Sequence, residues 1–378
     1  MSRSPVASAR LTSSVPLLAP RPPLFLALIA HLLLLGYALF VFTRGFLLSR
    51  IALPDVSSCS NSPVPGSWPS PPSSQSSSAP VGCWSSRPPP YKHALILLVD
   101  ALRFDFTLYD PSLSEPIPPY RNKLPIMQHL LDTQPRRALR YQFLADPPTT
   151  TLQRLKALST GTLPTFIDAG SNFGGSSILE DSWLTQAALA NRSASFVGDD
   201  TWLSLFPDVF RLSHPYPSLN VWDLHTVDEG VLAHLPSMME SKEDTILLGH
   251  FLGVDHCGHR HGPSHPAMAA KLKQMNTVLT DILASIDNDT IVFIFGDHGM
   301  DGKGDHGGDS RSELEAALFI YSGRDLDERG EEFDHLLRDM DQQRSHRSVA
   351  QVDLVPTLAM ALGLPIPFGS LGSIIPEI

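Results

Sequence analysis

The stretch TIVFIFGDHGMDGKGDHGG, Thr290 to Gly308, joins a short apolar run to two copies of Gly-Asp-His-Gly. The run is continuous and rich in isoleucine, valine and phenylalanine, which is typical of a strand buried on both faces of a parallel sheet. The first copy of the tetrapeptide follows this run directly, and the second lies in a glycine-rich loop. The stretch therefore predicts an α/β fold with polar side chains at a strand end.

Two further apolar runs have the same form. HALILLVDALR (residues 93–103) and DTILLGHFLGVD (residues 244–255) each lead to an aspartate. Between runs, residues 266–286 place apolar side chains at steps of three and four, which predicts a helix. Alternating strands and helices indicate a mostly parallel central sheet flanked by helices. Ligands of such sheets bind beyond the carboxyl ends of the strands, so we expect the three aspartates to converge there.

A single aspartate at a strand end often has only a structural role, but three on one edge would repel one another and raise their own pKa values. A cation among them resolves that repulsion. Histidines close to the aspartates give mixed carboxylate and imidazole donors, which suit zinc or manganese better than calcium. We expect Asp305, in the second tetrapeptide, to be a loop residue, and the glycines to let the backbone pass close to the ions. The candidate ligands are Asp100, Asp255, His259, Asp297, His298 and His306.

A nucleophile is offered by ADPPTTTLQRLKALSTGTLPTF, residues 145–166. Thr149, Thr150 and Thr151 precede a predicted helix, whose amino terminus favours a phosphate group. The alternative is that one threonine simply caps this helix. The pattern leaves both interpretations open.

Composition limits the classes of function. The chain has 378 residues, 42% hydrophobic content and a net charge of −11. It can bury a sizeable core, and its negative charge disfavours nucleic acid as a partner. Cys59, Cys83 and Cys257 show no CxxC spacing, so neither a zinc ribbon nor a thioredoxin-type centre is supported.

Residues 24–42, LFLALIAHLLLLGYALFVF, carry no formal charge and are close to the ~20 residues of a membrane-spanning helix. We interpret them as a retained anchor, because no small-residue cleavage site follows, although a signal peptide is the alternative. Residues 1–23 would form a short cytosolic tail. The sequons at Asn191 and Asn288 permit glycosylation and favour a lumenal location for the rest of the chain.

Residues 43–90 are rich in serine and proline, which predicts a lumenal linker. Cys59 and Cys83 lie within this segment and can either pair or remain free. Residues 91–378 would form the catalytic domain.

Long, ordered motifs in residues 93–375 resemble the alkaline phosphatase superfamily and, within it, the GPI ethanolamine phosphate transferases of the third-mannose type. The motifs are LLVDALRFDF, DPPTTTLQRLKALSTGTLPTFIDAGSNF, GHFLGVDHCGHRHGP, FGDHGMDGKGDHGG and QVDLVPTLAMALGLPIPFGSLG. The resemblance implies an alkaline phosphatase-like fold with two metal ions. Sulfatases share this fold but need a cysteine-based nucleophile segment, which the sequence after Thr151 does not provide.

The resemblance also implies roles for single residues. Asp255, His259 and His306 would bind one ion, and Asp100, Asp297 and His298 the other, together with the nucleophile. The Pro-Thr-x-[Thr/Ser] pattern selects Thr151 as that nucleophile, with Thr150 as the alternative, and Asn172 would contact a phosphate oxygen. Three more histidines, His256, His261 and His265, are weaker candidates, and Cys257 is interpreted as a packing residue.

The implied reaction moves phosphoethanolamine from phosphatidylethanolamine to a mannose of the GPI precursor through a phosphothreonine-type intermediate at Thr151. The enzyme would be anchored in the endoplasmic reticulum membrane, its catalytic domain in the lumen, with a small membrane subunit as a possible partner. Family members continue into a multi-span region that is expected to be missing after Ile378. Two alternatives stay open: a metal-dependent phosphodiesterase, or an inactive ectodomain that acts only through its partner.

Overall fold

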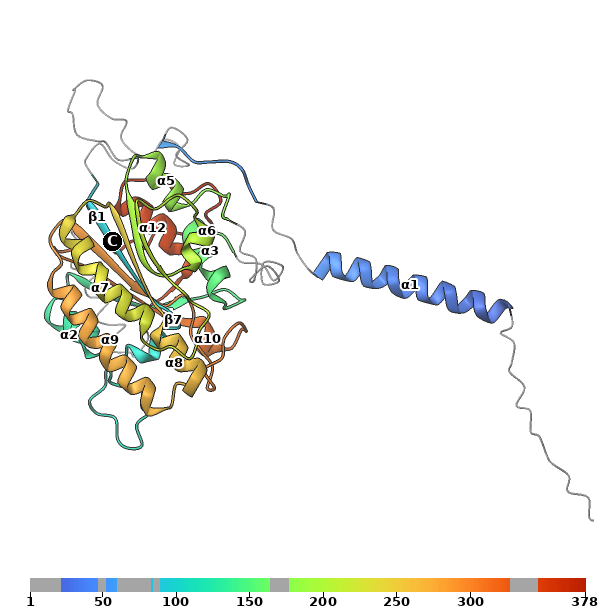
Figure 1. Cartoon of the computed structure of the whole chain (residues 1–378), viewed down its shortest axis with the longest axis horizontal. Helices are drawn as coiled ribbons and strands as arrows, with labels where there is room; N and C mark the ends of the chain where they lie inside the picture. The colour runs from blue at the N-terminus through green and yellow to red at the C-terminus, as the bar shows by residue number, and fades with distance from the viewer. Residues whose placement is uncertain (1–21, 47–51, 60–82, 84–88, 164–176, 327–345) are drawn as a thin grey trace, which may run out of the picture. The chain divides into compact units, whose positions relative to one another are not determined.

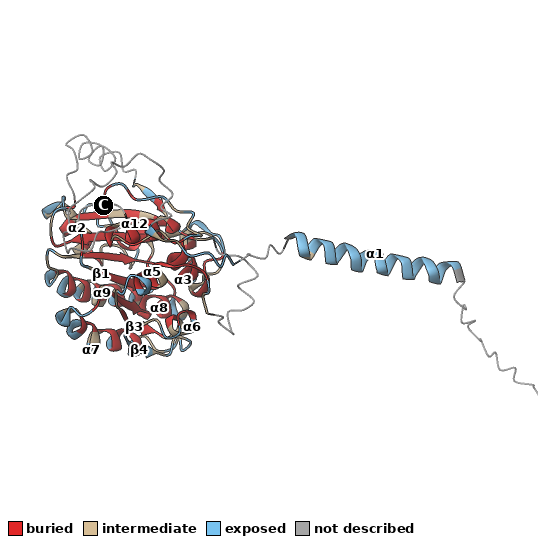
Figure 2. Cartoon of the chain, turned by 90° about the horizontal axis from the view of Figure 1, so that it is seen from above, coloured by how far each residue is buried: buried red, intermediate tan, exposed pale blue. Residues whose placement is uncertain are grey.

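The computed structural model describes residues 22–46, 52–59, 83, 89–163, 177–326 and 346–378. Packing divides the chain into two units, Met1–Leu48 and Ser49–Ile378. In the first unit, helix α1 (Pro22–Phe46) is exposed almost all round, as its pale colour in Figure 2 shows. Its segment Pro23–Gly45 has a mean hydropathy of 2.5, so it is long and apolar enough to cross a membrane. The predicted apolar helix is confirmed as a candidate span.

The second unit is built on an eight-stranded sheet with the order β4-β3-β5-β1-β6-β7-β2-β8 (Figure 1). Among these described strands only β7 runs against the others, because both of its pairings are antiparallel. The bounds are β1 His93–Val99, β2 Ala138–Leu144, β3 Ala194–Asp199, β4 Leu212–Tyr216, β5 Ile246–Phe251, β6 Thr290–Phe295, β7 Glu315–Ser322 and β8 Ser348–Ala350. The expected mostly parallel sheet is therefore confirmed.

Helices cover both faces of this sheet. One face packs against α3 (Thr151–Thr160), α5 (Trp183–Leu189), α6 (Thr201–Leu205) and α12 (Leu354–Ala361). The other packs against α2 (Pro125–Thr133), α7 (Thr226–Ser241), α8 (Gly253–His261) and α9 (Pro266–Ala284). Short helical turns complete the elements: η2 Phe104–Phe106, α10 Arg311–Leu314 and η3 Gln351–Asp353.

Strand β1 is a continuous apolar run because the sheet is buried on both faces at this strand. Its side chains alternate between the two cores: Ile96 and Leu98 face one, whereas Leu95 and Leu97 face the other. Full burial of each such side chain stabilises the fold by about 1.5–3 kcal/mol. The three runs predicted from the sequence become the neighbouring strands β5, β1 and β6, and the predicted helix becomes α9.

Part of the predicted linker is tied to the second unit. Cys59 and Cys83 form a disulfide with their Cα atoms 4.9 Å apart, which resolves the question left open by the sequence. The backbone N–H of Ser57 donates to Asp181, and its carbonyl accepts from Gln186. Residues 52–59 are therefore held against the domain by specific hydrogen bonds.

Candidate active site

The neighbouring strands β1 and β6 bring two of the predicted aspartates together. Asp100 follows the last residue of β1, and Asp297 lies two residues beyond the end of β6. The two strands pair in parallel, so both carboxylates lie at the same edge of the sheet. Asp255 differs from the expectation of a strand end: β5 stops at Phe251, and Asp255 lies in the first turn of α8. The apolar residues that follow β5 belong to this helix.

The first cluster contains Asp100, Asp297 and His298, all buried, with their ligand atoms within 4.8 Å of one another. His298 Nε2 lies 3.4 Å from Asp100 Oδ1 and 3.3 Å from Asp297 Oδ2. His298 Nδ1 is 2.8 Å from the carbonyl oxygen of Gly299. A carbonyl can only accept, so Nδ1 carries the hydrogen and Nε2 presents its lone pair to the two carboxylates.

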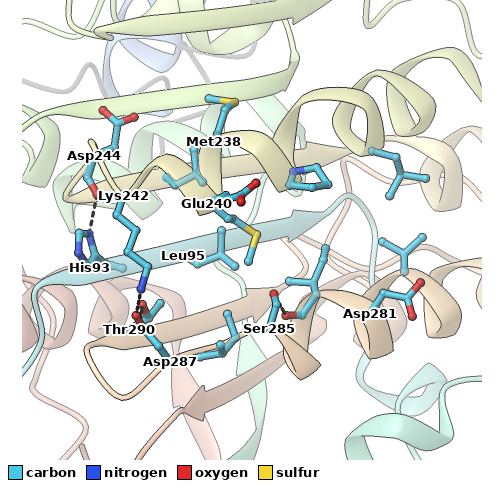
Figure 3. A pocket seen from close by; sticks show the side chains of 18 of the residues that line it. His93, Leu95, Met238, Glu240, Lys242, Asp244, Asp281, Ser285, Asp287 and Thr290 are labelled. Atoms are coloured by element: carbon cyan, nitrogen blue, oxygen red, sulfur yellow. Dashed lines mark hydrogen bonds and ion pairs between the residues drawn. The ribbon is translucent and has the colours of Figure 1, made fainter.

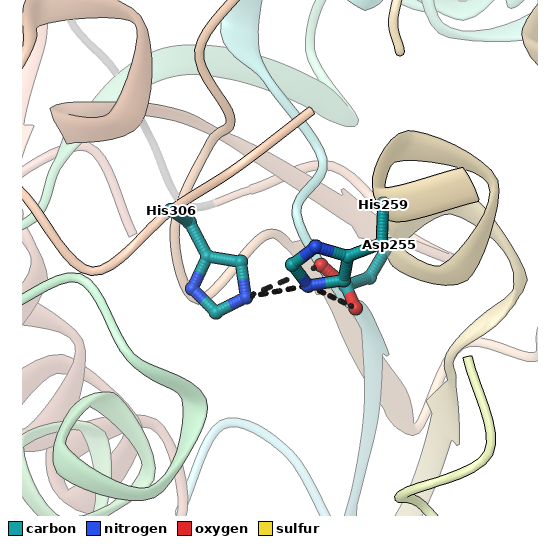
Figure 4. Close-up of side chains that lie close together, drawn as sticks. All are labelled: Asp255, His259 and His306. Atoms are coloured by element: carbon teal, nitrogen blue, oxygen red, sulfur yellow. Dashed lines mark hydrogen bonds and ion pairs between the residues drawn. The ribbon is translucent and has the colours of Figure 1, made fainter. Parts of the chain in front are cut away.

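The second cluster contains Asp255, His259 and His306 (Figure 4). The Nε2 atoms of the two histidines lie 3.0 Å apart, and each is close to a carboxylate oxygen of Asp255, at 3.5 and 3.6 Å. Asp255 and His259 are one turn apart on α8, so they project from the same face. His306 Nδ1 donates to the carbonyl oxygen of Thr149 over 2.8 Å, which leaves its Nε2 directed at the other members of the cluster.

The glycine-rich loop reaches α8 because Gly304 has no side chain. Its φ of +92° is in the region that favours glycine, and a Cβ there would lie 1.9 Å from the carbonyl oxygen of Gly258. This close approach places His306 beside the other histidine of its cluster. It also brings His306 against His298, with ring centroids 4.0 Å apart, so the two clusters are adjacent.

The donor atoms fit divalent cations. Asp100 Oδ1, Asp255 Oδ1 and Asp297 Oδ2 are buried and have no hydrogen-bond partner within the described part of the chain. Burial raises the pKa of Asp100 well above its usual range, and the charges of Asp297, Asp255 and Asp199 raise it further. Burial lowers the pKa of His298 to about 4. These carboxylate oxygens are buried without hydrogen-bond partners, and the neutral His298 imidazole beside them supplies no positive charge, so a cation is needed to offset their desolvation.

The three threonines have different surroundings. The Thr151 hydroxyl lies 3.3 Å from Asp100 Oδ2 and 3.3 Å from His298 Nε2. The Thr149 hydroxyl donates over 2.9 Å to a backbone carbonyl of the glycine-rich loop. The Thr150 hydroxyl bonds to a glutamine one turn along α3. Of the three hydroxyls, that of Thr151 faces the first cluster.

His250, which the sequence analysis did not select, is fully buried near the end of β5. The indole N–H of Trp202 donates to its Nδ1 over 3.1 Å, and an indole nitrogen can only donate. His250 Nε2 must therefore carry the hydrogen, which it donates to Asp100 Oδ2 over 3.2 Å. Asp199 completes a third group with these residues, but both ring nitrogens of His250 are already engaged. The position of His250 beside the end of a predicted strand is the sequence signal that could have identified it.

The weaker candidates lie outside both clusters. The ring nitrogens of His256 bond to two backbone carbonyls, at 2.7 and 3.1 Å. His261 and His265 stack on each other, with ring centroids 4.6 Å apart. Cys257 is buried, which raises the pKa of its thiol to about 11 and fits a packing role. Asn172 lies outside the described residues.

Comparison with known proteins identifies a matching family and several similar sequences. Residues 183–309 match the family of type I phosphodiesterase / nucleotide pyrophosphatase proteins. The chain is 47% identical over 94% of its length to human GPI ethanolamine phosphate transferase 3, catalytic subunit, and covers 31% of that protein. It is 45% identical over 89% of its length to GPI ethanolamine phosphate transferase 3 of Saccharomyces cerevisiae, again covering 31%. The chain thus spans about a third of the length of these relatives.

Among solved structures, the C-terminal periplasmic domain of EcEptC from Escherichia coli, solved in complex with Zn, has a TM-score of 0.50. The likeness covers 72% of this chain and 83% of that domain at 13% identity, so it bears on the fold alone. Together with the sheet order and its flanking helices, it confirms the expected α/β fold with a mostly parallel central sheet.

Proposed function

We propose that the chain, which is similar over most of its length to proteins named GPI ethanolamine phosphate transferase 3, transfers phosphoethanolamine from phosphatidylethanolamine to a mannose of the GPI precursor. The observation that carries this proposal is the Thr151 hydroxyl, which lies 3.3 Å from two members of the first cluster. A hydroxyl beside two adjacent cation-binding clusters suits transfer of a phosphoryl group through a covalent intermediate. The third mannose is the proposed acceptor, following the resemblance of the sequence motifs to the third-mannose type of transferase.

We infer that the two clusters bind two divalent ions. Zinc is the proposed metal for both clusters, and manganese is the alternative. Three donors from each cluster, with nitrogen and oxygen atoms mixed, match the ligands that zinc prefers. Thr151 would join Asp100, Asp297 and His298, whereas Asp255, His259 and His306 would hold the other ion. When bound, the pair would acidify the threonine hydroxyl and stabilise negative charge on the phosphoryl oxygens.

Side chains of this protein would carry out both halves of the reaction, the transfer to Thr151 and the transfer to mannose. Thr151 Oγ1 forms a bond to phosphorus while the bond from phosphorus to the diacylglycerol oxygen breaks. Asp100 Oδ2 is placed to take the hydroxyl proton, which leaves with the diacylglycerol. The amino terminus of α3 lies beside the reacting group and favours the phosphate through its free amides. In the second half, the mannose oxygen forms a bond to phosphorus while the bond from phosphorus to Thr151 Oγ1 breaks, and the proton of the mannose hydroxyl restores the Thr151 hydroxyl. Asn172 is proposed to contact a phosphate oxygen.

The proposed setting is the endoplasmic reticulum membrane. Residues 24–42 would anchor the chain, residues 1–23 would be cytosolic, and residues 43–90 would connect to a lumenal domain of residues 91–378. Both sequon asparagines, Asn191 and Asn288, are exposed, which supports glycosylation on the lumenal side. The human relative is named as a catalytic subunit, which supports a membrane partner subunit for this chain as well.

A transfer assay tests this function. The full chain is reconstituted with zinc in liposomes that contain phosphatidylethanolamine labelled in the ethanolamine and a trimannosyl GPI precursor. We expect the label to appear on the precursor and to vanish after chelation of the metal. Release of free phosphoethanolamine without labelled precursor would identify a phosphodiesterase instead. If the zinc-loaded chain does neither but retains a membrane partner, it acts through that partner alone.

The hydrogen bond from His250 leads to a second prediction. Because His250 and Thr151 hold Asp100 Oδ2, Oδ1 is left to face the cation. Replacing His250 with phenylalanine should weaken metal binding at the first cluster by about 10–100-fold, since residues that orient a ligand have effects of this size. Zinc titration calorimetry of the full chain measures the two affinities separately. His250→Gln, which keeps an N–H donor, should recover part of the loss. Equal weakening at both clusters would mean that His250 serves only the packing of the core.

A further inference from the structure

A cavity of about 900 Å³ lies between the carboxyl-terminal halves of α7 and α9 (Figure 3), and we call it the α7/α9 cavity. Leu95 from β1 and Leu247 from β5 form its floor, and Met238, Val278 and Ile282 line its walls. Binding sites for small molecules have volumes of about 300–1,000 Å³ and mostly apolar linings. The α7/α9 cavity meets both criteria.

This cavity is separate from the candidate active site. His93 and Thr290, the first residues of β1 and β6, line it. Asp100 and Asp297 follow the opposite ends of the same two strands. The seven residue steps from His93 to Asp100 span roughly 23 Å at about 3.3 Å per residue. A molecule in the cavity therefore does not reach the reacting atoms, and its binding is independent of the proposed transfer.

The lining favours an alkyl chain. Its apolar members are alanine, leucine, isoleucine, valine, proline and methionine, with no phenylalanine, tyrosine or tryptophan among the described lining residues. An aromatic ligand would find only the His93 imidazole to stack on. Met238 and Met239 have flexible, polarisable side chains that adapt to a chain of variable conformation.

The rim favours a positive head group. Helix α9 ends here without a basic residue in its last turn, so its negative dipole end is uncompensated within the helix, whereas Lys242 caps the end of α7. Glu240 on α7 and Asp281 on α9 both line the cavity (Figure 3) and form no ion pair within the described ranges. The other rim carboxylates already have cations: Asp287 pairs with Lys242, and Asp244 is bonded to an arginine.

We propose that the α7/α9 cavity is a second ligand site, which binds an amphiphile with a single alkyl chain and an ammonium head. The chain would lie over Leu95 and Leu247, and the ammonium would lie between Glu240 and Asp281. Apolar burial supplies most of the affinity, and the carboxylates select the charge of the head group.

The test uses the full chain in lipid nanodiscs and dodecylamine with a diazirine at the chain end as the probe. After illumination, mass spectrometry maps the labelled peptides. We expect saturable labelling of residues 232–247 and 274–290, with at least about tenfold weaker labelling by the matching dodecanoic acid probe. Labelling of these peptides that is not saturable, or that is equal for the two probes, would overturn the proposal.

Matched variants test whether the labelling comes from a probe bound in the α7/α9 cavity. Thr277 and Thr280 are both exposed on α9 and both donate to the carbonyl four residues earlier, but only Thr277 lines the cavity. Thr277→Trp should block the cavity and reduce labelling about tenfold, whereas Thr280→Trp should leave it unchanged. Glu240→Gln combined with Asp281→Asn should raise the half-saturating concentration about fivefold to tenfold. Equal labelling of both tryptophan variants would overturn the site.

Discussion

Thr151→Ala is expected to abolish the covalent phosphoethanolamine intermediate and to lower transfer by about a thousandfold or more. The substitution removes the only atom that can form the bond to phosphorus in the proposed mechanism, and loss of a nucleophile has effects of this size. The fold should be retained, because the hydroxyl makes two long contacts of 3.3 Å and α3 is held by buried leucines. Mass spectrometry of the acid-quenched enzyme measures the intermediate directly.

Thr150→Ala and Thr149→Ala are the matched controls. Their hydroxyls bond to a glutamine side chain and to a backbone carbonyl, away from the first cluster. Both variants should therefore still form the intermediate on Thr151. An intermediate that persists in Thr151→Ala and disappears in Thr150→Ala would move the nucleophile by one residue.

His306→Ala is expected to lower the zinc content of the full chain from about two ions to about one. His306 Nε2 lies 3.0 Å from His259 Nε2 and 3.6 Å from Asp255, so its removal leaves the second cluster with two donors. Two protein donors are fewer than the three or four that zinc sites in proteins use. Transfer should fall at least about a hundredfold, because one of the two ions that stabilise the phosphoryl group is lost.

Elemental analysis after gel filtration measures the metal content, and His261→Ala is the control. His261 belongs to the histidine-rich segment that also contains His259, but it stacks on His265 outside both clusters. It should keep about two ions and full transfer. Absence of tightly bound metal from the parent chain would refute the two-ion site, and equal loss in both variants would refute the specific role of His306.

The two clusters could be anticipated from the sequence only because their residues follow recognisable strands or share one turn of helix. Continuous apolar runs of six or seven residues have few alternatives to buried strands, so β1, β5 and β6 were predictable. Their parallel arrangement then placed Asp100 and Asp297 at one edge. The spacing of Asp255 and His259 fits one helical face, although the sequence suggested a strand end for Asp255.

Other features depend on contacts between distant segments. The reversed direction of β7 follows from its pairing with both β6 and β2, which no local pattern encodes. The position of His306 depends on Gly304 passing against Gly258, 46 residues earlier in the sequence. The α7/α9 cavity likewise exists only because two helices pack side by side over β1 and β5.

The sequence by itself determined the class of fold, the apolar amino-terminal helix and the set of residues with metal-binding chemistry, because these depend on hydrophobic runs and residue types. Only the tertiary structure decided which threonine faces the clusters, since Thr149, Thr150 and Thr151 are chemically alike and differ in the direction that the start of α3 gives each hydroxyl. It also decided the role of His250, whose protonated nitrogen is fixed by Trp202, 48 residues away in the chain. Side-chain direction and hydrogen-bond partners are properties of the packed molecule, and local sequence patterns do not contain them.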